Sequence, residues 1–336
     1  MLNYDRNSAR QWAREKMLGV ANVTIPTMTG DFTGLNEKAI RHDVELAVEH
    51  GFVGSLACSE VAISLDEYVQ SVRIMADHAA GRLFIVHHAV FNTLQDNIAV
   101  AKHAAEAGAD LVLLGYPPYF YPKSLEEVYN YTKAFCDATG LAVMVFPIPT
   151  WGFGRLSPSD IPIDLLRRLL DACPNIVAIK AEGGMPHIMA PIEVHRAFHE
   201  EVVISYPMEH ELIPLAQLID VPFSGTNFSA YYGPLLPRIF NMLRAGDYDA
   251  ATAAFYQMDA ARKAFGSVPQ AGNGLINRMM WKYEGWLQGY NGGPLRHPTA
   301  RVYQRDMVAL RKGLEASGLP VTTDPDESFF IGRNPA

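Results

Sequence analysis

Eight short apolar segments constrain what this 336-residue chain can fold into. Each is rich in Val, Ile, Leu or Phe, and its apolar residues are nearly continuous rather than alternating, which is typical of strands buried on both faces of a parallel sheet. They recur at intervals of roughly 20–35 residues, the period of a strand followed by a helix. The segments are residues 19–26, 52–58, 82–90, 110–116, 141–147, 175–181, 201–207 and 221–227. After about residue 247 we expect no further strand.

The stretches between these strands carry helix signals. Residues 36–51 and 64–81 each begin at a side chain that caps helices and end at a glycine. The same pattern predicts helices over residues 92–109 and 124–140, and a further helix is expected over residues 157–173. Apolar residues that recur at intervals of three and four predict helices over residues 247–265, 274–289 and 298–318. Eight strand and helix units in succession predict a (β/α)₈ barrel, an α/β fold with a C-terminal helical extension. A six-stranded doubly wound sheet is the alternative, but no G-x-G-x-x-G follows the first strand.

The order of these signals predicts how the chain is organised. We expect a helical lead-in over residues 1–17, a catalytic barrel over 18–240, C-terminal helices over 241–320 and an irregular tail over 321–336. No linker or low-complexity run separates these parts.

The composition excludes several classes of function. The net charge of −8 leaves no basic stripe to neutralise phosphates, so we expect no nucleic-acid partner. No stretch of about 18 apolar residues predicts a membrane span. The N-terminal residues are polar, without the apolar core of a secretory signal, so a cytoplasmic location is the default. Cys58, Cys136 and Cys173 are too few and too irregularly spaced for a disulfide framework or a structural zinc site.

A lysine stands where a buried strand should end. In IVAIKAEGG, residues 176–184, Lys180 follows four apolar or small residues, although an unpaired ammonium in an apolar site is costly. Barrel enzymes carry their chemistry at the carboxyl ends of the strands. Burial there lowers the pKa of a lysine, and its neutral amine can attack a ketone to form a Schiff base. The alternatives are pairing with a carboxylate such as Glu182, or extension to solvent.

This strand resembles a known one. VAIKAEGG, residues 177–184, is similar to the Schiff-base strand of the dihydrodipicolinate synthase and N-acetylneuraminate lyase family of class I aldolases. The resemblance covers residues 18–300. It implies a (β/α)₈ barrel in which Lys180 forms the Schiff base.

Two further segments carry the resemblance. GSLACSEVAISLDEY, residues 54–68, is similar to the family's G-[ST]-T-G-E-x-x-x-L-[ST]-x-x-E segment with one residue deleted. Glu60, Ser64 and Glu67 fall on the matching positions. GGPLRHP, residues 292–298, resembles the short Arg-x-Pro motif that follows the family's C-terminal helices.

The chain departs from the family at both of its proton-carrying tyrosines. Phe146 stands at the end of the fifth strand, and a phenyl ring can neither donate nor accept a proton. Phe120 takes the place of the tyrosine that the family supplies across a dimer interface, between Tyr119 and Tyr121. The proton carrier must therefore be another group. The candidates are a bound water, Ser59, Tyr119, Tyr116 and His210.

The residues that hold the substrate carboxylate in the family also differ. Ala57 and Cys58 replace its threonine pair, and Ser59 replaces its glycine. Backbone N–H groups with the Ser59 hydroxyl can still form a carboxylate nest. Cys58 is either a small buried thiol or a nucleophile.

Aromatic residues replace the arginine that binds the second substrate in dihydrodipicolinate synthases. Trp151 lies near that position, and with Phe153, Phe146 and Phe120 it would line an aromatic mouth. This favours an apolar or aromatic aldehyde partner, as in hydratase-aldolases that cleave arylidene-pyruvates. The alternative is that these rings belong to the core or to a subunit interface.

Acidic and histidine residues follow the seventh strand. Glu209 and His210 stand there, and the hydratase-aldolases carry residues of these kinds in this loop. Either can act as an acid or a base at the barrel mouth. A helix-capping role for Glu209 is the alternative.

Two other readings compete with the aldolase. A metal enzyme is suggested by His87 and His88 at a strand end and by His195 and His199 at helical spacing, but H-E-x-x-H is absent. Adjacent strand residues face opposite sides, so at most one of His87 and His88 can look into the barrel. A non-catalytic ligand-binding homologue is suggested by the missing tyrosines.

The sequence therefore predicts a Schiff-base lyase, an aldolase or hydratase-aldolase, acting on pyruvate or a substituted 2-oxo acid with an aldehyde partner. A 2-oxo acid dehydratase of the same family is the alternative. Lys180, Ser59 and Tyr119 are the expected catalytic residues. The expected substrate-binding residues are Ala57, Cys58, Phe146, Trp151, Glu60 and His210. No metal or organic cofactor is expected, and the resemblance implies a homotetramer built as a dimer of dimers.

Overall fold

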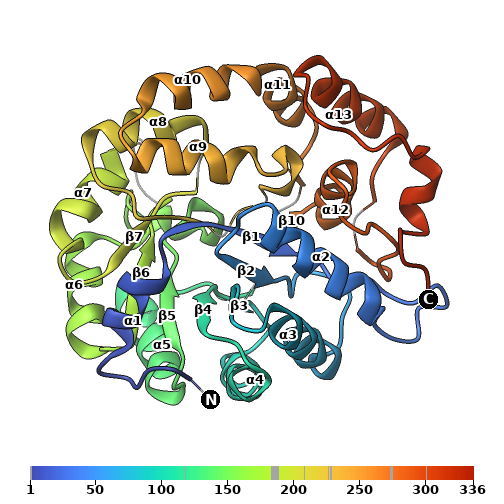
Figure 1. The fold of residues 1–336 in the computed structure, drawn as a ribbon. Coiled ribbons are helices and arrows are strands. Elements are labelled where there is room, and N and C mark those ends of the chain that lie inside the picture. Colours follow the sequence, from blue (N-terminus) through green and yellow to red (C-terminus); the bar gives the residue numbers. More distant parts are fainter. Residues whose placement is uncertain are drawn as a thin grey trace. The chain divides into compact units, whose positions relative to one another are not determined.

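The computed structural model describes residues 2–117, 119–182, 189–207, 209–225, 227, 229–272, 275–299 and 301–336. Eight parallel strands follow one another in chain order around a closed barrel, and helices alternate with them (Figure 1). Each strand lies inside its predicted segment, so the (β/α)₈ fold is confirmed. The strands are β1 (Gly19–Thr24), β2 (Gly54–Ala57), β3 (Phe84–Ala89), β4 (Leu111–Leu114), β5 (Ala142–Val145), β6 (Ile176–Lys180), β7 (Val203–Ser205) and β8 (Phe223–Ser224).

Two compact units make up the chain. Unit 1 falls within residues 1–19 and 84–225, and unit 2 within residues 20–83 and 226–336. Every described residue of β3 to β8 is buried, as expected for strands covered on both faces.

Unit 1 holds strands β3 to β8 and the helices that connect them, which Figure 1 shows outside the strands. Its helices are α1 (Ala9–Lys16), α4 (Leu94–Ala107), α5 (Leu125–Ala138), α6 (Ile163–Ala172), α7 (Met189–Phe198) and α8 (Glu209–Leu218), with short 3₁₀ turns η1 (Pro149–Trp151) and η2 (Phe153–Arg155). The predicted helix over residues 157–173 was wrong at its start. Pro162 disfavours helical backbone in the residue before it, and Asp160 has a left-handed backbone with a φ of 56°.

Helix α1 fastens the N-terminal segment to this unit. It packs against β5, β6 and β7. Arg10 donates hydrogen bonds to the carbonyl oxygens of Ile176 and Leu170, at 3.0 and 2.7 Å. The amino-terminal end of β6 is thereby held in place, while its other end carries Lys180.

Unit 2 holds β1, β2 and the remaining helices, which are α2 (Glu37–Glu49), α3 (Leu65–Ala79), α9 (Leu235–Arg244), α10 (Tyr248–Gln257), α11 (Asp259–Ser267), α12 (Arg278–Leu287) and α13 (Gln304–Ala316). It also holds 3₁₀ turns η3 (Ala230–Tyr232) and η4 (Asp326–Phe330). The expectation of no strand after residue 247 was wrong. A short antiparallel pair, β9 (Ala271–Gly272) and β10 (Leu275–Ile276), lies there. Two residues per strand are too few to leave an alternating pattern in the sequence.

The family-like segment after β2 has a structural role in unit 2. Ser64 caps α3 by accepting from the Glu67 N–H, and the Glu67 carboxylate accepts from the Ser64 N–H. Arg296 donates two hydrogen bonds to Glu67, at 2.9 and 2.7 Å, and these lower the pKa of that carboxyl to about 2. This bidentate pair ties the residues of the Arg-x-Pro-like motif to the start of α3.

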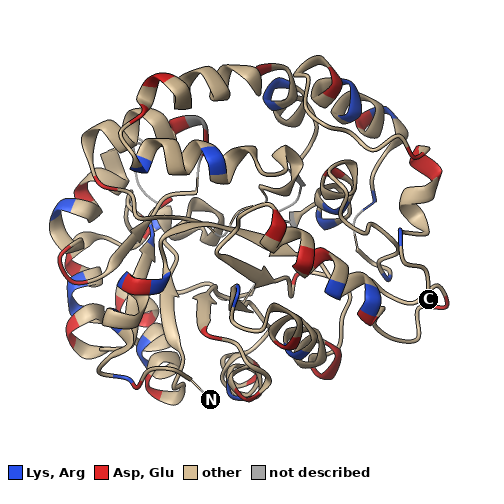
Figure 2. Cartoon of the chain, viewed as in Figure 1, with Lys and Arg blue, Asp and Glu red and all other residues tan. Residues whose placement is uncertain are grey.

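The outer helices of unit 1 carry charged residues of both signs (Figure 2). Figure 2 shows acidic and basic residues interspersed along the outer helices of unit 1, where Arg167 pairs with Glu201 and Arg168 with Glu126. Across the described residues, no helix combines the length and the apolar character that crossing a membrane requires.

Two adjacent histidines are buried in β3. His87 is fully buried and His88 is 4% exposed. Burial lowers the pKa of each imidazole from 6.5 to about 3. Both rings are therefore neutral in the folded protein at pH values where the unfolded chain binds protons.

We predict that this difference makes the fold sensitive to mild acid. Below pH 6.5 the unfolded chain takes up protons that the folded chain excludes, so the free energy of unfolding falls as the pH drops toward 3. Between pH 7 and pH 5 the loss is about 2 kcal/mol per histidine. Urea denaturation at both pH values measures it. His87→Gln should make the stability less dependent on pH, and His103→Gln, at an exposed position of α4, is the matched control. Equal stability of the wild-type protein at both pH values would contradict this account.

Candidate active site

Lys180 is the last residue of β6 and is only 4% exposed. It pairs in register with Ser205 of β7, and the next residue, Ala181, donates its N–H to the Ser205 carbonyl at 2.9 Å. The backbone is thus fixed by strand pairing where the lysine side chain leaves it. The amine lies at the carboxyl end of a barrel strand, the place where such folds carry chemistry.

A carboxylate and an aromatic ring lie beside the amine. Lys180 Nζ lies 3.1 Å from Glu182 Oε1 and 4.0 Å from the centre of the Phe146 ring. The lysine therefore does not extend to solvent, and the pairing with Glu182 that the sequence left open does form. Burial lowers the pKa of Lys180, and the charge and hydrogen bond of Glu182 oppose that shift. A carboxylate and a π-face together stabilise a cation in a buried place.

The two histidines of β3 have different neighbours. The positive charge of Lys180 adds to the effect of burial in lowering the pKa of His88. The His87 ring stacks on Phe91, with ring centres 6.3 Å apart. His88 is thus the histidine whose surroundings include the lysine.

Tyr206 is a residue of this region that the sequence reasoning missed. It directly follows β7, is 2% exposed, and its hydroxyl donates a hydrogen bond to Glu211 in the first turn of α8. Burial raises the pKa of Tyr206 most, followed by the bond to Glu211 and the charges of Glu211 and Glu182. A phenol at the end of a predicted strand was the signal that could have found it.

Aromatic rings continue from the lysine site. The Phe146 and Trp151 rings meet edge to face at 5.9 Å, and the Trp151 Nε1–H donates to the Phe146 carbonyl at 2.7 Å. Trp151 also meets Tyr116 at 5.8 Å. Gly115 makes room for it, because a Cβ there would lie 3.0 Å from the indole ring. Phe146 and Tyr116 are buried, whereas Trp151 is half-buried.

The aromatic residues after β4 differ in how far they are exposed to solvent. Phe120 is half-buried and stacks on Tyr116 at 5.5 Å. The Tyr116 hydroxyl is engaged with the Thr132 hydroxyl at 2.7 Å. Tyr119, a predicted catalytic residue, is 83% exposed in this single chain, and Tyr121 is 77% exposed. The side chain of His210 lies outside the described part of the structure, although its backbone belongs to α8.

The predicted carboxylate nest lies in unit 2, at the end of β2. Ala57 ends this strand, and the Cys58 N–H donates to the Thr24 carbonyl at 3.1 Å. The Cys58 thiol is buried, and burial raises its pKa, against the effect of nearby Arg278 and Lys282. The small buried thiol is therefore the better description. The Ser59 hydroxyl has no hydrogen-bond partner among the described residues.

Glu60, one residue further along, forms an ion pair with Arg278. Arg278 is 3% exposed, lies over the Trp281 ring at 4.2 Å, and has its Nε and Nη1 groups unpartnered within the described residues. The sequence reasoning missed it. An arginine as the first residue of a helix is unfavourable next to the positive end of the helix dipole, and that was the available signal.

The histidines raised for a metal enzyme do not gather into a ligand set. His195 and His199 stack at 4.3 Å, and His199 Nδ1 lies 2.7 Å from the His195 carbonyl oxygen. Among the described residues, no group of three or more His, Cys, Asp or Glu side chains is placed to hold a metal ion.

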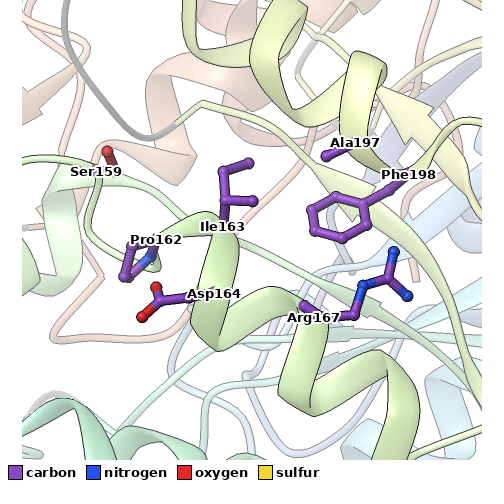
Figure 3. A pocket seen from close by; sticks show the side chains of 7 residues that line it. All are labelled: Ser159, Pro162, Ile163, Asp164, Arg167, Ala197 and Phe198. Atoms are coloured by element: carbon purple, nitrogen blue, oxygen red, sulfur yellow. The ribbon is translucent and has the colours of Figure 1, made fainter.

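A groove of about 670 Å³ opens between α6 and α7, and its lining includes none of the predicted site residues (Figure 3). Ile163, Asp164 and Arg167 line it from α6, and Phe198 lines it from α7. The Arg167 guanidinium lies 4.9 Å from the centre of the Phe198 ring and pairs with Glu201. Its charged group is thus already satisfied.

Comparison with known proteins is consistent with this architecture. A 4-hydroxy-tetrahydrodipicolinate synthase of Rhizobium meliloti is 32% identical over 154 residues, which cover 45% of this chain and 51% of that relative. This match thus spans about half the length of the curated relative. A probable 5-dehydro-4-deoxyglucarate dehydratase of a Chelativorans species is 28% identical over 316 residues, covering 87% of this chain and 93% of that relative.

A solved structure shares the fold. A dihydrodipicolinate synthase from Acinetobacter baumannii, complexed with pyruvate, superimposes with a TM-score of 0.75 at 18% identity, covering 90% of this chain and 99% of that one. The model of the dihydrodipicolinate synthetase family matches residues 27–304. The resemblance seen in the lysine strand is therefore confirmed, and the chain belongs to the dihydrodipicolinate synthetase family.

Proposed function

We propose that the protein is a Schiff-base-forming lyase that acts on pyruvate or a substituted 2-oxo acid. One observation carries this proposal: the buried amine of Lys180 lies at the end of β6, 3.1 Å from a carboxylate and 4.0 Å from an aromatic face. Burial lowers the pKa of this amine, so more of it is neutral and nucleophilic near pH 7 than for an ordinary lysine.

The chemistry follows from this amine. Neutral Lys180 attacks the ketone of the 2-oxo acid, and loss of water gives a protonated imine. That imine withdraws electrons from the neighbouring carbon, so a carbon–carbon or carbon–oxygen bond beyond it can break or form. Glu182 and the Phe146 ring, which surround the ammonium, would stabilise the positive imine in the same way.

We assign the substrate carboxylate to the end of β2. The backbone N–H groups of residues 57–59 and the unpartnered Ser59 hydroxyl would form the nest, with Glu60 holding Arg278 beside it. Within the described residues, the Nε and Nη1 groups of Arg278 have no hydrogen-bond partner and are left to donate.

The aromatic surface supports an apolar or aromatic aldehyde as the second partner. Phe146, Trp151, Tyr116 and Phe120 form a continuous set of ring contacts that begins at Lys180. The half-buried Trp151 and Phe120 have surface left to cover. The reaction would be an aldol or hydratase-aldol cleavage, or its reverse.

A dehydratase acting on a 2-oxo acid is the second candidate. The relative from the Chelativorans species, matched over most of both chains, is named as a dehydratase. Arg278 favours this candidate, because a buried guanidinium with free N–H groups suits a second carboxylate on the substrate. Detection of an aldehyde and a 2-oxo acid as products distinguishes the lyase from an enzyme that only removes water.

One further expectation belongs to this proposal. A homotetramer is proposed from the family resemblance. The exposed Tyr119 would then serve in catalysis only if it reached a neighbouring subunit.

We predict that incubation with pyruvate and sodium borohydride, which reduces an imine, leaves a stable pyruvate adduct on Lys180. Peptide mass spectrometry locates it, and Lys180→Ala abolishes it. Lys282 is an internal control, because burial lowers its pKa to about 7 while its amine donates to the Pro26 carbonyl at 2.7 Å and to the Thr27 hydroxyl at 2.6 Å. An adduct on Lys282 alone would show that a low pKa, rather than the site at β6, decides reactivity.

We predict that Trp151→Ala impairs the use of aromatic aldehydes. Loss of a large apolar contact should raise KM for benzaldehyde-type partners about tenfold or more, with a smaller effect on short aliphatic aldehydes. Condensation with pyruvate measures both. Tyr121→Ala is the matched control, because Tyr121 is an exposed aromatic residue of the same unit. An equal effect of Trp151→Ala on both classes of aldehyde would show that the indole ring is not part of the surface that binds aromatic aldehydes.

We predict that Arg278→Met raises KM for the 2-oxo acid by about 10- to 100-fold, because a charge-assisted hydrogen bond is lost. The effect on kcat should be smaller, since Arg278 is assigned to binding. The variant also leaves the Glu60 carboxylate unpaired. Arg278→Met combined with Glu60→Gln therefore separates lost binding from this added charge. An unchanged KM in the double variant would show that the substrate carboxylate binds away from Arg278.

A further inference from the structure

We propose that Glu182 is the proton carrier for imine formation at Lys180, and that Tyr206 and Glu211 are positioning residues behind it. This inference rests on the proposed Schiff-base function. It answers the question that Phe146 raises, because a phenyl ring at the end of β5 cannot move a proton.

The position of Glu182 suits this role. It stands two residues after Lys180, and its Oε1 lies within hydrogen-bond distance of the reacting amine, at 3.1 Å. Its backbone N–H donates to the Pro147 carbonyl at 3.2 Å and to the Lys180 carbonyl at 3.1 Å. These bonds fix the start of the loop after β6 against the residue that follows Phe146. The side chain is 14% exposed, so it is largely sheltered from solvent.

Other groups considered for the role are placed less well. The Tyr116 hydroxyl is engaged with Thr132, and Tyr119 is 83% exposed in this chain. His88 is near Lys180, but burial lowers its pKa to about 3, so its imidazole is a weak base at neutral pH. The Glu182 carboxylate, by contrast, is in direct contact with the amine nitrogen, at 3.1 Å.

The proton steps balance with one carboxylate. Starting from the ion pair, Glu182 takes a proton from the Lys180 ammonium, and the neutral amine attacks the ketone carbon. A proton then moves from nitrogen to the former ketone oxygen, giving a carbinolamine. Protonated Glu182 donates to the hydroxyl, which leaves as water while the nitrogen lone pair forms the C=N bond. The product is again a pair of one cation and one carboxylate, so the site keeps its net charge.

Tyr206 and Glu211 are placed to support this carboxylate. Tyr206 follows Ser205, the register partner of Lys180, and its hydroxyl donates to Glu211. The charge of Glu182 adds to the rise in the pKa of Tyr206, after burial and the bond and charge of Glu211. By donating to Glu211, the phenol engages a second carboxylate of this region. The amine then exchanges its proton with Glu182.

The sign of one rate change tests the proposal. If Glu182 only held Lys180 in its charged form, Glu182→Gln would further lower the lysine pKa, and imine formation at neutral pH would be faster. If Glu182 carries the proton, the same substitution slows imine formation by about 100-fold or more in spite of the larger neutral fraction. Glu182→Asp retains a carboxylate and should recover part of the rate.

The measurement is a time course of pyruvate incubation, quenched with borohydride, with the Lys180 adduct measured by mass spectrometry. Glu126→Gln, which removes an exposed carboxylate paired with Arg168, should match the wild-type rate. Tyr206→Phe should slow imine formation in the wild-type background and have little effect in Glu182→Gln, as expected for a residue that acts through Glu182.

The outcomes separate the two proposals. No adduct on Lys180 in the wild-type protein, with pyruvate or other 2-oxo acids, would overturn the Schiff-base function itself. A wild-type adduct together with an unchanged or faster rate in Glu182→Gln would overturn only the role of Glu182. Equal slowing by Tyr206→Phe in both backgrounds would show that Tyr206 does not act through Glu182.

Discussion

A positive charge at the end of a buried strand is the constraint around which the site of unit 1 is arranged. Lys180 is almost fully buried, and taking an ammonium group out of water costs several kcal/mol. Glu182 and the face of Phe146 offset this cost from two sides. A protonated imine at the same nitrogen carries the same charge as the ammonium. The surroundings that make Lys180 tolerable are therefore also those that would stabilise the reactive intermediate.

The barrel holds this arrangement through its backbone. Strand pairing with Ser205 fixes the carboxyl end of β6, and Arg10 of α1 holds its amino end. Strand β3 of the same unit contributes neutral histidines rather than further cations, because burial keeps both imidazoles unprotonated near pH 7. The two histidines therefore add no positive charge that would repel Lys180 near pH 7. The same burial lowers the free energy of unfolding in acid.

The sequence predicted the strands well because each is a continuous apolar run, and it predicted Lys180 because a lysine breaks such a run. It failed where the signal was local or absent. Two-residue strands such as β9 leave no periodicity, and Pro162 delays α6. Arg278 was missed because only tertiary packing brings it to Glu60. Tyr206 was missed because its bond to Glu211 depends on how α8 begins after β7, which the sequence pattern does not indicate. Ser64 and Glu67 matched a family pattern, and the structure shows that they cap α3 and bind Arg296.

Oxygen exchange tests the central claim most directly. Reversible imine formation at Lys180 replaces the ketone oxygen of pyruvate with oxygen from water, so the protein should speed the loss of label from [2-¹⁸O]pyruvate, as followed by mass spectrometry. The account predicts exchange faster than in buffer alone, and its absence in Lys180→Ala. Exchange at the buffer rate, or undiminished exchange in Lys180→Ala, would contradict the claim that this buried amine reacts with 2-oxo acids.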